Sequence, residues 1–209
     1  ATCQGYLNHR EELKVAATDE SHEDVLQFPL ASISTPVLID NIFYEFDRAD
    51  LTKASELELD KLVALLNENP HVTIELSSHC DYKGSAEYNK RLSQRRAESV
   101  VNYLIAHGIA ADRLTPMGYG KERPKKIKKK VAEKYPWLKV DDELTPDFIK
   151  ALKNPEKEEI CNSLNRRTEF TVLRTTYGLF DENGNLKAQP KPAKKPESSS
   201  DDVDFEFYE

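Results

Sequence analysis

The sequence predicts an α+β fold built on a mixed β-sheet with its helices packed on one side. Two adjacent stretches support this fold class most strongly. Val72, Ile74 and Leu76 alternate with polar residues, as in a strand with one buried face. From 89 to 107 the apolar side chains recur at helical spacing instead, and Gly108 follows as a helix stop. Because strand and helix patterns keep alternating along the chain, the expected order of elements is βαβαβ-αβ.

Shorter patterns on either side of this pair predict the remaining elements. A capping box formed by Ser55 and Glu58 predicts the start of the first helix, which carries apolar side chains along one face. The other strands are expected at Ile42–Phe46, Arg113–Met117 and Glu169–Leu173.

These elements place a domain at 39–178, with a helical insertion at 121–164. Residues 1–38 hold too few strand-like pieces for a core of their own. They are therefore either the tail of a preceding β domain or an extension packed on the main domain. Beyond this domain the hydrophobic pattern is lost, so we expect residues 179–209 to be a low-complexity, flexible acidic tail.

The insertion begins with a strongly basic run, Lys121–Lys130. Such a run is typical either of a solvated loop or of a surface that binds an anionic polymer, and we favour the loop. The apolar stretch Tyr135–Leu138 is expected to anchor the insertion. Thr145-Pro146 and Asn154-Pro155 each pair a capping residue with proline at the first helical position, so each predicts a helix start.

The overall composition gives no support for a nucleic-acid partner or a membrane span. The 209 residues are enough for a substantial core, and the net charge of -7 argues against nucleic-acid binding. No apolar run is long enough to cross a bilayer, so any membrane attachment is expected through parts absent from this chain. The first residues read like the middle of a strand, which suggests a fragment of a longer secreted protein.

The reactive residue types do not form a recognisable catalytic or metal-binding motif. The three cysteines, Cys3, Cys80 and Cys161, are far apart and odd in number, so neither a disulfide framework nor a zinc site is expected. None of the five histidines has metal-ligand spacing. His79 and Cys80 are neighbours, so in a strand they point to opposite faces and cannot act as base and nucleophile. We therefore expect no catalysis and no cofactor.

A candidate binding site lies where the strand at 71–77 ends and the next helix begins. Asp81 follows the strand, and Arg96 lies fifteen positions later on the helix. On a helical wheel Arg96 falls at the edge of the apolar stripe, whereas Arg95 points away from it. A carboxylate and a guanidinium could together hold a group that carries both an ammonium and a carboxylate. Periodicity alone leaves another interpretation open, in which Arg96 extends from the core edge or pairs with a local acid.

Four spaced motifs between 41 and 173 resemble the OmpA C-terminal-like domain that OmpA, Pal and MotB share. They are Phe43–Asp47, the stretch from Asp81 to Ala97, Gly118-Tyr119-Gly120, which we expect to be flexible, and Asn165–Glu169. The resemblance implies a module that holds peptidoglycan non-covalently in the periplasm, associated with the outer membrane. Segment 121–164 is similar to the version found in multidomain Bacteroidetes envelope lipoproteins, which implies a larger assembly such as the type IX secretion system.

The resemblance also implies which residues bind the ligand. Asp81 and Arg96 would clamp the diaminopimelate of the stem peptide, with Asp81 taking its ammonium and Arg96 its carboxylate. Asn89, Cys80 and Asp47 complete the implied ligand-binding set.

Two positions depart from the family pattern, because Ser78 and Cys80 stand where the family usually has Gly and Thr. They leave the clamp intact and change the shape of its pocket. The expected partners are the peptidoglycan stem peptide and other envelope or secretion-system proteins. A protein-interaction scaffold in the periplasm with an unused pocket is the alternative function.

Overall fold

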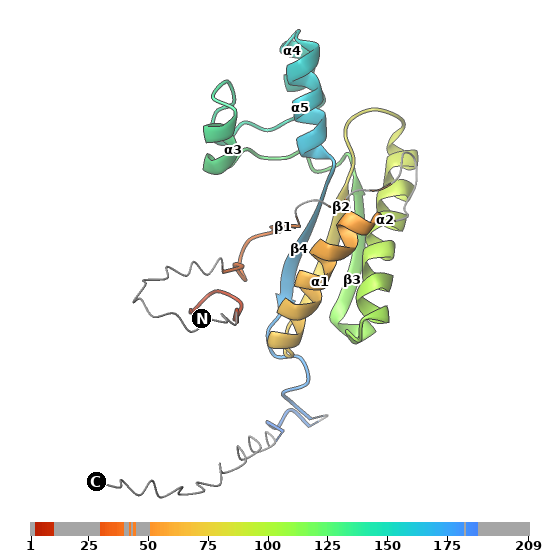
Figure 1. Ribbon diagram of the computed structural model, residues 1–209, viewed down its shortest axis with the longest axis vertical. Coiled ribbons are helices and arrows are strands. Elements are labelled where there is room, and N and C mark those ends of the chain that lie inside the picture. Colours follow the sequence, from red (N-terminus) through yellow and green to blue (C-terminus); the bar gives the residue numbers. More distant parts are fainter. Residues whose placement is uncertain are drawn as a thin grey trace, which may run out of the picture. The chain divides into compact units, whose positions relative to one another are not determined.

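A four-stranded sheet organises the part of the chain that the computed structural model describes, namely residues 3–10, 30–39, 42, 44, 51–181 and 183–187 (Figure 1). Its strands are β1 (Val37–Ile39), β2 (Thr73–His79), β3 (Leu114–Gly120) and β4 (Arg167–Arg174). The helices are α1 (Lys53–Glu68), α2 (Ala86–Ala106), the 3-10 turn η1 (Ala111–Arg113), α3 (Lys129–Lys134), α4 (Pro146–Ala151) and α5 (Pro155–Asn165).

The predicted mixed sheet is confirmed. The strand order is β1-β4-β2-β3, where β2 and β3 are parallel and β4 runs antiparallel to both β1 and β2. His79, the last residue of β2, pairs with Arg167, the first residue of β4. The ends of β2 and β3 and the start of β4 therefore meet at one end of the sheet, and α5 leads into β4 at that end (Figure 1).

The main core lies between one face of the sheet and two helices. Ile74 and Leu76 lie two residues apart in β2, so they share a face, and both are fully buried. They belong to one cluster with side chains from α1 and α2, namely Leu59, Leu62, Leu66, Val100, Val101 and Leu104. The helices α1 and α2 thus pack on the same side of the sheet, as predicted.

The insertion has a small core of its own. Its buried members are Ile127, Leu138, Leu144, Ile149 and Cys161. Both predicted helix starts are confirmed, because Thr145 caps α4 and Asn154 caps α5 through their side-chain oxygens, each with proline at the first position. The three insertion helices gather at the end of the sheet where β4 begins (Figure 1).

The predicted start of the first helix was wrong by one turn. Thr52 is the N-cap, and its hydroxyl accepts the Ser55 N–H at 3.4 Å. Ser55 is instead the third helical residue, fully buried, with its own hydroxyl 3.0 Å from that of Thr52. Glu58 forms an ion pair with Lys61 at 3.0 Å. Thr52 satisfies the free N–H groups of the first turn one turn earlier, so the expected box does not form.

The first described strand lies upstream of the prediction at Ile42–Phe46. β1 covers only Val37–Ile39, too short for an alternating pattern to reveal it. Most of the predicted strand lies outside the described residues. The described Ile42 belongs to no strand, and Tyr44 makes only an isolated bridge to Leu51.

Residues of the N-terminal stretch contribute to the main core. Leu7 is 2% exposed and belongs to the same cluster as the α1 and α2 side chains. The Asn69 side chain accepts the Asn8 N–H and donates to its carbonyl, both at 2.9 Å. Residues 178–187 belong to a separate unit, in which the Asp181 side chain accepts the N–H groups of Asn183 and Asn185.

The glycines expected to be flexible are instead the last part of β3. Gly118 lies so close to α2 that a Cβ atom there would stand 2.2 Å from the Gln94 backbone nitrogen. Its N–H donates to the Gln94 side-chain oxygen at 2.8 Å. The absence of a side chain lets the strand approach the helix, which fixes this end of the sheet against α2.

Gly118→Ala should therefore destabilise the fold through overpacking, by about 3 kcal/mol, because the contact is with helix backbone that cannot turn away. Gly108→Ala is the matched control. Gly108 has φ +88° but open space around it, so the backbone strain should cost only about 1 to 2 kcal/mol. Urea unfolding of both variants checks the order, and a smaller loss for Gly118→Ala would contradict the close approach.

Candidate functional site

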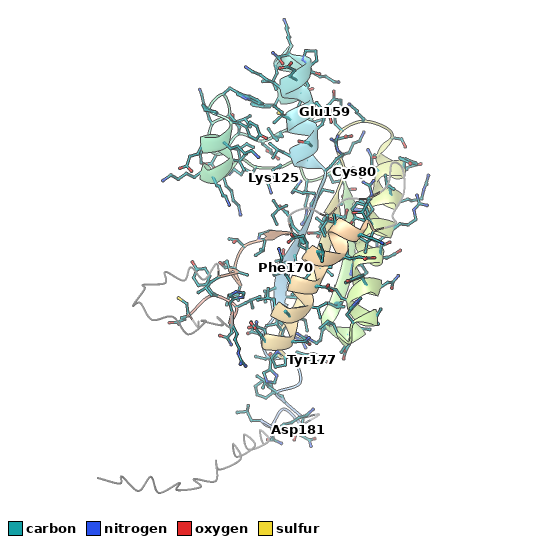
Figure 2. All side chains as sticks on the ribbon, in the orientation of Figure 1. Cys80, Lys125, Glu159, Phe170, Tyr177 and Asp181 are labelled. Atoms are coloured by element: carbon teal, nitrogen blue, oxygen red, sulfur yellow. The ribbon has the colours of Figure 1, made fainter. Side chains whose placement is uncertain are left out.

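A pocket of about 250 Å³ opens at the end of the sheet where β2 ends and β4 begins. Its lining residues are Ile42, Tyr44, Ser78, His79, Arg96, Ser163, Arg166, Arg167 and Thr168. Cys80, Lys125 and Glu159 mark this end of the molecule, whereas Phe170 lies further along β4 (Figure 2). The pocket therefore combines the strand ends, α2 and the insertion.

Arg96 reaches the pocket from α2, as its helical position predicts. It is half-buried, whereas Arg95 is exposed. The Arg96 guanidinium carbon lies 4.7 Å from the centroid of the Tyr44 ring, within cation–π range. The Tyr44 hydroxyl lies 3.2 Å from the Thr168 hydroxyl, and burial raises its pKa. Tyr44 thus braces the guanidinium, a role that the sequence had not indicated.

Asp81 is not among the lining residues, but it is held by Arg166, which lines the pocket and which the sequence analysis missed as part of the site. The Arg166 Nη1 donates to Asp81 Oδ2 at 2.6 Å, and its Nη2 donates to Glu159 Oε1 at 2.6 Å. The hydrogen bond from Arg166 lowers the pKa of Glu159. The Lys83 N–H donates to the second Asp81 oxygen at 3.0 Å. The signal available in the sequence was the motif Asn165–Glu169, which contains both Arg166 and Arg167.

Asn89 and Cys80 do not line the pocket, and they shape the loop that presents Asp81. The buried Asn89 amide donates to the Lys83 carbonyl at 2.7 Å and to the Asp81 carbonyl at 3.5 Å. The Cys80 N–H donates to the Gly120 carbonyl at 2.8 Å, so it is already used. Burial raises the pKa of the Cys80 thiol. Asp47 lies outside the described residues.

A buried charge cluster adjoins the pocket through Arg167, which is one of the lining residues. Glu169 is 8% exposed, and one of its oxygens lies 2.8 Å from Lys125 Nζ and 2.9 Å from Arg167 Nε. Burial alone would raise the pKa of Glu169, but Arg167 and Lys125 outweigh it and lower the pKa to about 2. Lys125 belongs to the basic run of the insertion, so this lysine secures the insertion to β4.

His79 faces this cluster as a neutral ring. It is 3% exposed and stacks on Tyr119 with centroids 5.4 Å apart. Burial, followed by the charge of Arg167, lowers the pKa of His79 to about 3. Within the described part of the chain, neither ring nitrogen has a hydrogen-bond partner. His79 is one of the lining residues of the pocket, but both nitrogens are buried, and Nε2 lies 3.7 Å from Glu169 Oε2.

The described residues contain no group of three or more His, Cys, Asp and Glu side chains placed to hold a metal ion. Among the helices in these ranges, none combines the length and apolar character needed to cross a membrane.

Residues 43–135 match the model of the OmpA family. The peptidoglycan-associated lipoprotein of Rhizobium meliloti is 33% identical over 85 residues, or 41% of this chain and 48% of that protein. The outer membrane protein P5 of Haemophilus influenzae is 32% identical over 100 residues, or 48% of this chain and 28% of that protein. The chain thus spans about half or less of the length of these curated relatives.

Solved structures of low sequence identity are also similar. The peptidoglycan-associated lipoprotein from Burkholderia pseudomallei is 21% identical with a TM-score of 0.45, over 63% of this chain and 87% of that chain. The cell wall anchor of the T6SS from Pseudomonas aeruginosa is 20% identical with a TM-score of 0.44, over 66% of this chain and 79% of that chain.

The buried neutral state of His79 predicts a loss of stability in weak acid. Its folded pKa is about 3 against an ordinary 6.5, so the unfolded chain takes up the extra proton first as the pH falls. The stabilisation is complete above pH 6.5 and is lost as the pH falls toward 3. From pH 7 to pH 5 the free energy of unfolding should drop by about 1 to 2 kcal/mol, measured by urea unfolding.

His79→Gln should flatten this dependence, whereas His107→Gln, at an exposed helix end, should keep it. Glu169 adds its own loss only below its ordinary pKa of 4.5, because its folded pKa is lower still. An unchanged pH slope in His79→Gln would show that another group titrates.

Proposed function

We propose that this chain binds peptidoglycan non-covalently through the diaminopimelate of its stem peptide and thereby anchors an envelope assembly to the cell wall. One observation carries the proposal: Arg96 and Arg166 line one pocket, and Arg166 bonds directly to Asp81. The pocket thus offers guanidinium donors for a carboxylate beside a carboxylate acceptor for an ammonium. The OmpA family match, which spans Asp81 and Arg96, supports the same assignment.

Asp81 keeps the capacity to accept an ammonium. Its carboxylate has about four acceptor positions, of which the Lys83 N–H and Arg166 occupy two. The side chain is 14% exposed, and it is bonded to Arg166, which lines the pocket. In this proposal Asp81 takes the ammonium, and Arg96 takes the carboxylate of the same amino acid end.

The cellular setting follows from the same proposal. The matched relatives are named as a peptidoglycan-associated lipoprotein and an outer membrane protein. We place this chain in the periplasm, associated with the outer membrane, as a binding module without catalysis. The helical insertion at 121–164 further suggests an envelope lipoprotein of the type IX secretion system. Within that system, this chain is similar to PorE.

The clamp predicts unequal roles for neighbouring arginines. Arg96→Ala should weaken binding of a stem-peptide fragment by about 2 to 5 kcal/mol, the range for removing one partner of a desolvated charge pair. Asp81→Asn should weaken it comparably, because the amide cannot neutralise an ammonium. Arg95→Ala, on the exposed side of α2, is the matched control and should bind like the parent.

Isothermal titration with a diaminopimelate tripeptide measures these affinities, and retention on purified sacculi provides a second readout. Equal losses in Arg95→Ala and Arg96→Ala would contradict the register of the clamp. Sacculus binding that survives both Asp81→Asn and Arg96→Ala would contradict the clamp, and a parent that does not bind sacculi would favour the scaffold with an unused pocket.

The clamp also predicts discrimination between stem peptides. A peptide with lysine in place of diaminopimelate offers the ammonium but lacks the carboxylate, so Arg96 loses its anion. Leaving a partly desolvated guanidinium unpaired should weaken binding by about tenfold or more. Titrations at low and moderate salt separate this effect from general charge attraction, which is screened beyond about 10 Å at 0.1 M ionic strength. Equal affinities that fall together with salt would refute the clamp.

A further inference from the structure

A second cavity of about 300 Å³ adjoins the clamp pocket. It runs between β1, the start of α3 and the end of α5. Five lining residues belong to both cavities, namely Ile42, Ser163, Arg166, Arg167 and Thr168. One wall is apolar and includes Pro36, Leu38 and Leu164. The two cavities are therefore neighbouring parts of one groove, reachable by a single extended ligand.

The charges around this second cavity are strongly unequal. Five basic residues line it, namely Lys125, Lys128, Lys130, Arg166 and Arg167, against one acid, Glu169. Lys125 and Arg167 both pair with Glu169. Arg166 is paired with Asp81 and Glu159.

Lys128 and Lys130 are the remaining basic residues that line the second cavity. Both are exposed, and neither forms an ion pair with any residue that the structure describes. Their neighbours differ in this respect, because Lys126 lies 3.3 Å from Asp141 and Lys129 lies 4.0 Å from Glu133. Neither of these neighbours lines the cavity. The excess positive charge of the groove is therefore concentrated at Lys128 and Lys130.

We infer that Lys128 and Lys130 form a second anionic subsite that takes another carboxylate of the same stem peptide, and this rests on the proposed function. A stem peptide carries carboxylates besides that of the clamped end, on its glutamate and on a terminal alanine. Alanine methyl groups suit the apolar wall beside Leu38 and Leu164. The insertion thus reads the peptide on one side of the diaminopimelate, while Asp81 and Arg96 hold the diaminopimelate itself.

The test combines ligand amidation with charge removal in the chain. The ligands are a diaminopimelate tripeptide with free or amidated glutamate carboxylate, and the tetrapeptide with free or amidated terminal D-alanine. The variants are Lys128→Gln with Lys130→Gln, and the control Lys126→Gln with Lys129→Gln. The two double variants lose the same charge from the same segment. Titration at about 0.15 M salt, where the screening length is about 8 Å, suppresses long-range attraction.

We expect the parent to lose about three- to tenfold in affinity when one of the two carboxylates is amidated, as for one or two exposed charge pairs. The Lys128 and Lys130 double variant should lose a similar factor with the free acid and show no further loss on amidation. The control should behave as the parent. The amidation that lowers the affinity of the parent identifies which carboxylate, that of glutamate or that of the terminal D-alanine, Lys128 and Lys130 bind.

Two outcomes would overturn the subsite while leaving the clamp intact. In one, the Lys128 and Lys130 double variant binds every ligand as the parent does. In the other, the control variant loses as much affinity, which would mark general charge attraction. A parent that binds none of the peptides would overturn the clamp and the subsite together.

Discussion

The ion pairing of the buried Glu169 carboxylate is the interaction on which the arrangement of the site depends. It lies on β4 and joins Lys125 of the insertion to Arg167 of the same strand. A carboxylate at 8% exposure is stable only when cations meet it, and here two do. This pairing holds the insertion over the strand ends, so residues far apart in sequence line one groove.

The site itself depends on the antiparallel pairing of β2 with β4. That register sets His79 opposite Arg167, which brings the loop carrying Asp81 to the helix end carrying Arg166. Gly118 contributes from the other side by letting β3 approach α2, the helix that carries Arg96. Backbone geometry therefore positions Asp81, Arg96 and Arg166, three side chains that are themselves partly exposed to solvent.

The two anion-binding regions differ in how they are built. Arg96 and Arg166 are half-buried or paired and set in elements fixed by the fold. Lys128 and Lys130 are exposed and long, at the start of a short helix. Charged groups held in place by the fold suit discrimination between ligands, whereas exposed charges without ion-pair partners add affinity and remain sensitive to salt.

Local patterns in the sequence determined most of the elements, apart from β1 and the start of α1. Period-two and helical spacing predicted β2 and α2, and they separated Arg96 from Arg95, because side-chain direction follows from backbone period alone. The caps Thr145 and Asn154 could also be predicted, because a capping residue and the proline after it are neighbours in the sequence.

Only the tertiary structure decided what depends on contacts between distant segments. The pairing of Asp81 with Arg166 spans 85 positions, and that of Lys125 with Glu169 spans 44. The short β1, the support of Arg96 by Tyr44 and the close fit of Gly118 are likewise set by neighbours far along the chain. A charged residue in a basic or acidic run has no preferred partner until the strands pair, since electrostatic attraction depends on distance in space.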